Sequence, residues 1–147
     1  MNILIINGPN LNLLGKREPH IYGNMTLNDI NDKIKVEFSK NNNINFEFYQ
    51  NNIEGEIINK LHSSIGKFNG IVINAGAYTH TSLAIADAIK AIQIPTIEVH
   101  LSNIYSREEI RHKSFLSPCC IGQISGFGFY SYILAVQALI NYLKNTN

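Results

Sequence analysis

The segment 96–111 holds the side chains of this sequence that are best suited to chemistry. His100 carries an imidazole, a group that gains and loses protons near neutral pH and can act as an acid or a base. Arg107 and Arg111 are one helical turn apart on one face, and Arg111 could hold a carboxylate through two parallel hydrogen bonds. The alternative without chemistry is a histidine at the core edge beside a salt-bridged surface helix, with Glu98 fixing its surroundings.

The segment 74–82 adds an amide and a second histidine. Its small residues let the backbone approach a ligand, and Ser82 can cap the helix that follows. Asn74 and His80 would then face a crevice, although an ordinary strand-to-helix turn with a solvated His80 explains the same residues. Asp87 lies in the following helix, where a solvated carboxylate is the common explanation.

The segment 8–24 is unusually long for a connection between a strand and a helix. It carries several amides together with Arg17 and Tyr22, and long loops of this kind often close over an active site, so we predict a lid loop. The alternative is a cluster of Asn, Gly and Pro turns with a surface arginine and a tyrosine that covers the core.

The elements that must position these side chains follow from the apolar pattern. Segments rich in β-branched or aromatic residues predict strands at 3–6, 44–49, 71–73, 96–99 and 121–124. Apolar residues with helical spacing predict helices over 27–38, 57–65, 85–92 and 129–143. Thr26, with Asp29 three residues later, resembles a capping box at the start of the first helix.

This alternation predicts an α/β fold, namely a flavodoxin-like, doubly wound, five-stranded parallel sheet with helices on both faces. In such sheets ligands bind beyond the carboxyl ends of the strands, where the order of connection reverses. Asn10, Asn74 and His100 all fall just beyond predicted strand ends, so we expect the three segments to meet at one rim of the sheet.

Composition limits the class of protein and its partners. The chain has 147 residues, 45% of them apolar, which is enough for one core, so we expect a single domain over residues 1–147. A formal charge of +1 argues against a nucleic-acid partner, and no apolar run approaches the roughly 18 residues of a membrane span. The start of the sequence does not resemble a leader, and the adjacent Cys119 and Cys120 cannot link distant segments, which fits a reducing, cytoplasmic location.

Several chemistries lack their usual motifs. The His, Asp, Glu and Cys residues do not fall at HExxH or CxxC spacing, so we predict no metal site. A GxSxG elbow and a Walker lysine loop are absent, and Gly126-Phe127-Gly128 is only a fragment of the dinucleotide-binding motif. Cys119 and Cys120 are predicted to be buried packing residues.

The motifs resemble those of the type II 3-dehydroquinate dehydratases, in order and over nearly the whole chain. The matching runs are Gly8-Pro9-Asn10-Leu11-Asn12-Leu13-Leu14-Gly15, Arg17-Glu18-Pro19, Tyr22-Gly23, Asn74-Ala75-Gly76-Ala77-Tyr78-Thr79-His80-Thr81-Ser82, Ile97-Glu98-Val99-His100-Leu101-Ser102-Asn103, Arg107-Glu108-Glu109-Ile110-Arg111 and Ser117-Pro118. The resemblance implies anti elimination of water from 3-dehydroquinate, through an enol or enolate, to give 3-dehydroshikimate in the shikimate pathway. It implies no metal and no organic cofactor. Cys119-Cys120 departs from related sequences, which commonly have other small or apolar residues there, but this concerns core packing and leaves the site assignments intact.

The resemblance also implies roles in proton transfer. Tyr22 would be the base, and His100 would be the acid that protonates the leaving hydroxyl. Arg17 would assist Tyr22 from the same loop, and Asn10 would steady the enolate oxygen through a water molecule.

The remaining implied roles concern binding and assembly. The substrate hydroxyls and carboxylate would be held by Asn74, His80, Arg111 and the backbone at Leu101 and Ser102. Asp87 would reach the site of a neighbouring subunit, because the family assembles as trimers grouped into a homododecamer.

Tyrosine needs assistance to act as a base. A phenol has an ordinary pKa near 10, so about one in a thousand is ionised at pH 7, which costs ~4 kcal/mol of barrier. A guanidinium close to the phenol oxygen favours the phenolate and recovers part of that cost, which is the role expected of Arg17. Closure of one loop would bring both groups over the substrate and exclude water.

Three other classes of protein remain to be weighed. A nucleotide- or flavin-binding module uses the same fold, and fold alone does not decide function. A phosphoacceptor receiver domain needs acidic residues where this sequence has Asn7 and Asn74. A dehydroquinate dehydratase of the Schiff-base type needs a catalytic lysine in a larger barrel.

Overall fold

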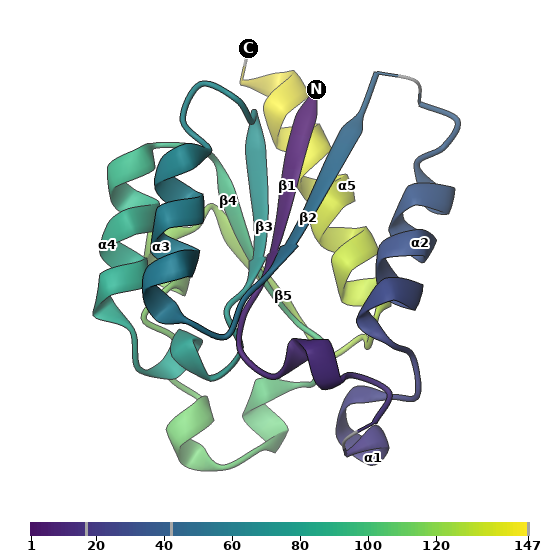
Figure 1. Cartoon of the computed structure of the whole chain (residues 1–147), viewed down its shortest axis with the longest axis vertical. Helices are drawn as coiled ribbons and strands as arrows, with labels where there is room; N and C mark the ends of the chain where they lie inside the picture. The colour runs from purple at the N-terminus through teal and green to yellow at the C-terminus, as the bar shows by residue number, and fades with distance from the viewer. Residues whose placement is uncertain (17, 42, 147) are drawn as a thin grey trace.

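The computed structural model describes residues 1–16, 18–41 and 43–146, and of Tyr22 only the backbone. Five parallel strands form one sheet in the order β2-β1-β3-β4-β5 (Figure 1). The strands are β1 (Asn2–Asn7), β2 (Asn45–Gln50), β3 (Gly70–Asn74), β4 (Thr96–His100) and β5 (Gly122–Ser125). The fold is the predicted α/β, flavodoxin-like parallel sheet, and each predicted strand is present to within a residue or two at its ends.

The central strands are buried on both faces, which explains their sequence. β3 and β4 are buried along their whole length, and β1 is exposed only at Asn2. A parallel sheet covered by helices on both faces selects nearly continuous runs of Ile, Val and Leu instead of alternating polar and apolar residues. Two exceptions to this apolar rule, Glu98 and His100, lie at the end of β4 and are described with the site.

Four α-helices cover the sheet in two pairs (Figure 1). They are α2 (Leu27–Glu37), α3 (Glu54–Ser63), α4 (Leu83–Ile92) and α5 (Tyr130–Asn145). Ile3 and Ile5 of β1 pack in the cluster with α2 and α5, whereas Leu4 and Ile6 pack in the cluster with α3 and α4. Successive residues of a strand point to opposite faces, so one strand supplies both halves of the core.

Helix starts follow the predicted caps. The Thr26 hydroxyl accepts from the backbone N–H of Asp29, whose carboxylate accepts from the backbone N–H of Thr26. The Ser82 hydroxyl accepts from the backbone N–H of Ile85 at the start of α4. Both caps satisfy backbone donors that have no partner within their helix.

Two details differ from the sequence predictions. The connection from β4 to β5 contains the short 3-10 helices η3 (Ile104–Ser106), η4 (Glu109–Arg111) and η5 (Ser117–Cys119), where a surface helix through Arg107 and Arg111 was expected. Cys119 and Cys120 precede β5 and are half-buried against the α3–α4 side of the core, not fully buried. Among the described residues, no helix is long and apolar enough to cross a membrane.

Candidate active site

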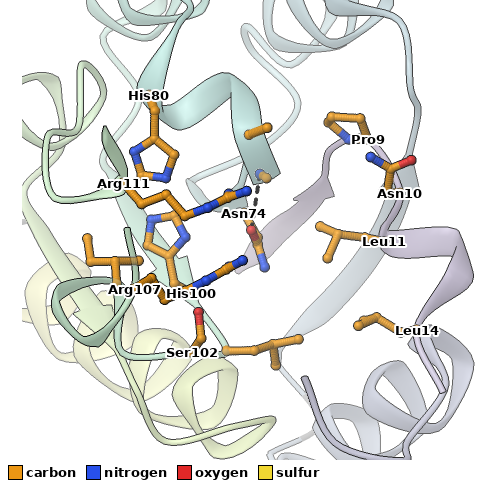
Figure 2. A pocket seen from close by; sticks show the side chains of 14 residues that line it. Pro9, Asn10, Leu11, Leu14, Asn74, His80, His100, Ser102, Arg107 and Arg111 are labelled. Atoms are coloured by element: carbon orange, nitrogen blue, oxygen red, sulfur yellow. Dashed lines mark hydrogen bonds between the residues drawn. The ribbon is translucent and has the colours of Figure 1, made fainter. Parts of the chain in front are cut away.

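A cavity of about 110 Å³ lies at the carboxyl ends of β1, β3 and β4, where the strand order reverses between β1 and β3 (Figure 2). Residues from all three predicted segments line it: Asn10, Asn74, His80, His100, Leu101, Ser102 and Arg111. Arg107 and several apolar residues, among them Leu11 and Ile104, complete the walls. Residues far apart in the sequence therefore meet at the edge where a doubly wound sheet places its ligand.

The wall nearest the start of the chain depends on a close approach between two loops. A side chain at Gly8 would place its Cβ only 2.4 Å from the backbone oxygen of Ala75, so this position requires glycine. The next turn brings Asn10 to the cavity in a left-handed backbone conformation (φ 68°), and its backbone N–H donates to the Asn52 side chain at 3.0 Å. The loop after β2 thus steadies the base of the 8–24 loop.

Asn74 ends β3 and is held by a buried tyrosine. Its side-chain nitrogen donates to the Tyr132 hydroxyl at 2.9 Å, and that hydroxyl donates to the side-chain oxygen of Asn7 at 2.6 Å. Burial raises the pKa of Tyr132 well above its ordinary value, so the phenol stays protonated and able to donate. One hydroxyl on α5 therefore links the amides that end the two central strands β1 and β3.

His80 lies on η2 (Gly76–His80) with one ring nitrogen already engaged. Its Nδ1 is 2.7 Å from the backbone oxygen of Lys113, and a carbonyl only accepts, so Nδ1 carries the proton. Burial lowers the pKa of His80, and the neighbouring His100 and Arg111 lower it further, so the neutral ring is favoured. Nε2 is then free to accept a hydrogen bond from a ligand hydroxyl at the cavity.

His100 is the last residue of β4 and is paired with a buried carboxylate. Its Nε2 lies 2.6 Å from Oε1 of Glu98, whose side chain is completely buried. Burial opposes ionisation of Glu98, but hydrogen bonds from His100, Ser117 and Ser114 outweigh it and hold the pKa of the carboxyl below its ordinary value. Among the described residues, the other ring nitrogen of His100, Nδ1, has no hydrogen-bond partner, so it is the nitrogen left for a ligand.

The two histidine rings lie one above the other beside the cavity (Figure 2). Their centroids are 6.2 Å apart and their planes differ by 18°. Two protonated rings at this distance would repel each other, which is one cause of the lowered pKa of His80. The arrangement therefore favours a neutral His80 beside a His100 that is hydrogen-bonded to Glu98.

Two arginines give the cavity a positive wall. Oε2 of Glu108 lies 2.9 Å from Nε of Arg111 and 3.9 Å from Nε of Arg107, which steadies both side chains. Figure 2 shows both guanidinium groups reaching past the histidine rings toward the middle of the cavity. The expectation of a single helical face is wrong, because Arg107 follows η3 and Arg111 ends η4, yet both reach the same space.

The 8–24 loop contains the short helix α1 (Pro19–Tyr22), which the sequence did not predict. Residues on both sides of Tyr22, Ile21 and Gly23, line a second cavity of about 660 Å³. That cavity shares Leu101, Ser102 and Arg107 with the first, so α1 borders a space that adjoins the histidine-lined cavity. Arg17 lies outside the described residues, and Tyr22 is placed by its backbone alone.

Asp87 is not brought to this cavity within the chain. It lies on an exposed position of α4, and it is not among the residues that line either cavity. That Asp87 reaches the site of a neighbouring subunit therefore stays a prediction.

The arrangement suits proton transfer on a small anion that carries hydroxyl groups. A carboxylate-supported imidazole can give or take a proton, two guanidinium groups can bind a carboxylate, and amide groups with a neutral imidazole can bind hydroxyls. Among the described residues, no group of three or more His, Cys, Asp or Glu side chains is placed to hold a metal ion. Fold and site together thus have the features of an α/β enzyme, with groups suited to acid–base chemistry at the rim of the sheet.

Comparison with known proteins identifies the family. The family model described as dehydroquinase class II matches residues 1–140. The 3-dehydroquinate dehydratase of Trichodesmium erythraeum (strain IMS101) is 59% identical over 144 residues, which cover 98% of this chain and 95% of that protein. The crystal structure of type II dehydroquinase from Butyrivibrio crossotus DSM 2876 superposes with a TM-score of 0.91 at 50% identity, over 95% of this chain and 97% of that one. That from Propionibacterium acnes gives a TM-score of 0.88 at 39% identity, over 95% and 96%.

The chain belongs to the class II dehydroquinase family and is a hydro-lyase. The resemblance recognised in the sequence motifs is confirmed.

Sequence reasoning did not assign some of the residues that build the site. It noted Arg107 but gave it no role, and it did not single out Tyr132 or Ser114. A usable signal for Tyr132 was present, because Asn7 and Asn74 each end a buried strand and a buried amide requires a partner. Which residue provides that partner depends on the packing of α5, which no local pattern contains.

Proposed function

We propose that this chain is a 3-dehydroquinate dehydratase that catalyses anti elimination of water from 3-dehydroquinate to 3-dehydroshikimate through an enol or enolate, in aromatic amino acid biosynthesis. The observation that carries the proposal is His100, held by the buried Glu98, in a cavity that also receives two arginine side chains. The acid and the anion-binding arginines lie on one side of the cavity. The lid loop on the opposite side supplies the base. Family membership makes this reaction the natural one to test.

The first step is removal of the proton alpha to the ketone. Tyr22 in its phenolate form takes this proton, and the electrons move onto the ketone oxygen to give the enolate. Arg17 lies on the same loop in the sequence, and its guanidinium favours the phenolate over the phenol. Asn10 lines the cavity and, through a water molecule, donates to the enolate oxygen.

The second step is departure of the hydroxyl group. The enolate re-forms the ketone, a carbon–carbon double bond forms, and the carbon–oxygen bond breaks as His100 gives its proton to the leaving oxygen. Water is therefore the leaving group, and Glu98 stabilises the imidazolium before transfer. The proton held by Tyr22 returns to solvent, and His100 regains one, so the cycle balances.

The substrate is held by groups from the rim. Arg111 binds the carboxylate through two parallel hydrogen bonds, together with the backbone at Leu101 and Ser102. Asn74 and the neutral His80 bind substrate hydroxyls, with Nε2 of His80 as an acceptor. Their polar groups are already oriented by the protein, which limits the entropy lost on binding.

The lid and the assembly complete the proposal. The 8–24 loop closes over the substrate and brings Tyr22 and Arg17 opposite His100, and its α1 segment borders the second cavity, which adjoins the histidine-lined one. The protein is cytoplasmic and forms a homododecamer as a tetramer of trimers, in which the exposed Asp87 reaches the site of a neighbouring subunit. Light scattering on the purified protein tests the assembly, and a monomer would contradict it.

The direct test is incubation of the purified chain with 3-dehydroquinate in the presence of a chelator. The expected result is a rise in the ultraviolet absorbance of a conjugated enone carboxylate, at a rate that added metal does not change. Treatment with borohydride in the presence of substrate is expected to leave activity intact, because no Schiff base forms. A preparation that gives no such absorbance would overturn the proposal.

A further inference from the structure

We propose that the hydroxyl groups of Ser114 and Ser117 are positioning groups that hold Glu98 as an oriented carboxylate and thereby fix the direction and protonation of His100. The proposal rests on the proposed acid role of His100, and it concerns residues that do not line the cavity. It explains how a carboxylate with a fully buried side chain stays charged at the end of a central strand.

The geometry around Glu98 carries the proposal. The Ser114 hydroxyl lies 2.9 Å from Oε1 and 2.9 Å from Oε2, and the Ser117 hydroxyl donates to Oε2. His100 approaches Oε1 at 2.6 Å, so both carboxylate oxygens have partners. Among the described residues, His100 is the sole basic side chain that forms an ion pair with Glu98, so the neutral hydroxyls must supply the rest of its stabilisation.

Rotation of the Ser114 hydroxyl away from Glu98 would break hydrogen bonds to the backbone. Its oxygen accepts from the backbone N–H of Leu116 at 3.1 Å and of Ser117 at 2.9 Å. With its acceptor positions occupied by these two donors, the single hydroxyl proton is directed at the carboxylate. The backbone turn therefore orients the hydroxyl, and the hydroxyl orients Glu98.

The same segment also orients the second histidine. The backbone oxygen of Lys113 accepts from His80, and the backbone N–H of Phe115 donates to the backbone oxygen of Thr79 at 2.9 Å. Residues 113–117 thus hold His80 directly and His100 through Glu98. The two rings held in this way are the ones that lie stacked beside the cavity.

The charged surroundings define how the pair responds to pH. Titratable or charged groups near the pair or its neighbour include His80 on η2, Arg107 after η3, Arg111 on η4 and Cys120 beyond η5. Burial raises the pKa of the Cys120 thiol to about 12, so it is neutral near pH 7. The strands on either side oppose Glu98 with the uncharged Ile73 and Gln123, and the charged residues of α4 are exposed.

The sign of the expected effect follows from charge balance. A hydroxyl that donates to Glu98 favours the form of the pair in which the carboxylate is negative and His100 is neutral. Loss of that donor disfavours this form, so the pair keeps its proton to a higher pH. At the same time His100 is less well oriented, so proton transfer to the leaving group slows.

The test compares Ser117→Ala with Ser117→Thr, which keeps the hydroxyl, and with Ser63→Ala, which removes an exposed hydroxyl on α3 that bonds only its own helix. In Ser117→Ala we expect kcat to fall about tenfold, as for loss of one hydrogen bond to a charged group, with KM little changed. The alkaline limb of the kcat profile should move up by ~0.5 to 1 pH unit. Ser117→Thr should recover most of both effects, and Ser63→Ala should behave as the parent chain.

A second readout does not depend on turnover. Titration of the His100 ring by NMR, without substrate, should show the same upward shift in Ser117→Ala and in Ser114→Ala, with thermal unfolding used to confirm that each variant is folded. An unshifted titration in folded variants would overturn the positioning role, even if the chain is an active dehydratase. A shifted titration in a chain that never converts 3-dehydroquinate would support the positioning role and refute the proposed function.

Discussion

The two walls of the cavity are built in different ways. The wall formed by the buried strands β3 and β4, which we call the fixed wall, is backed by the 113–117 segment, and partners within the protein hold its polar groups, as in the Glu98–His100 pair. The opposite wall is the 8–24 loop, in which Asn10, Glu18, Pro19 and His20 are exposed. The difference suggests a division of labour, because a fixed wall can orient an acid and bind an anion while an exposed loop can open for the substrate.

Removal of the proposed base tests the loop side and should have the largest effect. Tyr22→Phe deletes only the phenolic oxygen, so we expect kcat to fall by about 10³-fold with KM largely retained. Steady-state kinetics give both constants, and Tyr142→Phe on the exposed face of α5 is the matched control. Full activity in Tyr22→Phe would exclude the phenol as the base.

Removal of the proposed acid tests the fixed wall. In His100→Ala we expect kcat to fall by about 10²-fold, with release of the hydroxyl impaired more than removal of the alpha proton. Exchange of that proton with deuterated solvent, measured beside dehydration, separates the two steps. If exchange and dehydration both continued at the parental rate, His100 would have no acid role.

The anion-binding part of the fixed wall should affect binding more than turnover. Arg111→Ala removes a charged, two-point contact, so we expect KM to rise about tenfold or more with a smaller change in kcat. Lys144→Ala, which removes an exposed cation at the end of α5, serves as the control for a general loss of charge. An unchanged KM in Arg111→Ala would mean that the carboxylate is bound elsewhere, with Arg107 the next candidate.

The fixed wall also depends on the core behind it. Tyr132→Phe leaves the amides of Asn7 and Asn74 without their shared hydroxyl, so we expect the free energy of unfolding to fall by ~1–3 kcal/mol. Urea unfolding measures this change, and a small rise in KM should accompany it because Asn74 loses an orienting bond. Equal stability of Tyr132→Phe and the parent chain would show that water or rearrangement replaces the hydroxyl.

The smallest expected effect concerns the charge on His80. Burial lowers its pKa from the ordinary value of 6.5, so the ring stays neutral until the pH falls below that value. Protonation then removes the lone pair on Nε2, and substrate binding should weaken as the pH falls through the lowered pKa. NMR titration, with the resonance assigned through His80→Ala, tests this, and a pKa above 6.5 would contradict it.

Prediction from sequence worked where the signal was local. Strand and helix positions followed from apolar spacing, and the capping box at Thr26 followed from two residues three apart. Prediction failed in the β4–β5 connection, where the (i, i+4) spacing of Arg107 and Arg111 suggested a helix. In that connection the backbone forms short 3-10 turns, and turns such as the one at Ser114 are stabilised by tertiary contacts to Glu98 instead of by a continuous helical ladder.

The site divides in the same way. Asn10, Asn74 and His100 could be predicted because each lies at or just beyond the end of a strand, and the ends of parallel strands must share one edge. The partners that orient them, Tyr132 for Asn74 and Ser114 for Glu98, could not, since 58 and 16 residues respectively separate each pair. Contacts across such separations depend on how whole elements pack.

The sequence by itself determined the fold class, the family and the edge of the sheet at which the polar residues gather, because apolar period and motif order are local properties of the chain. Only the tertiary structure decided that His100 bonds a buried Glu98, that burial favours a neutral His80 whose Nδ1 is engaged by a carbonyl, and that two arginines reach one cavity. Protonation and orientation depend on neighbours within a few ångströms, and the folded chain alone brings those neighbours together.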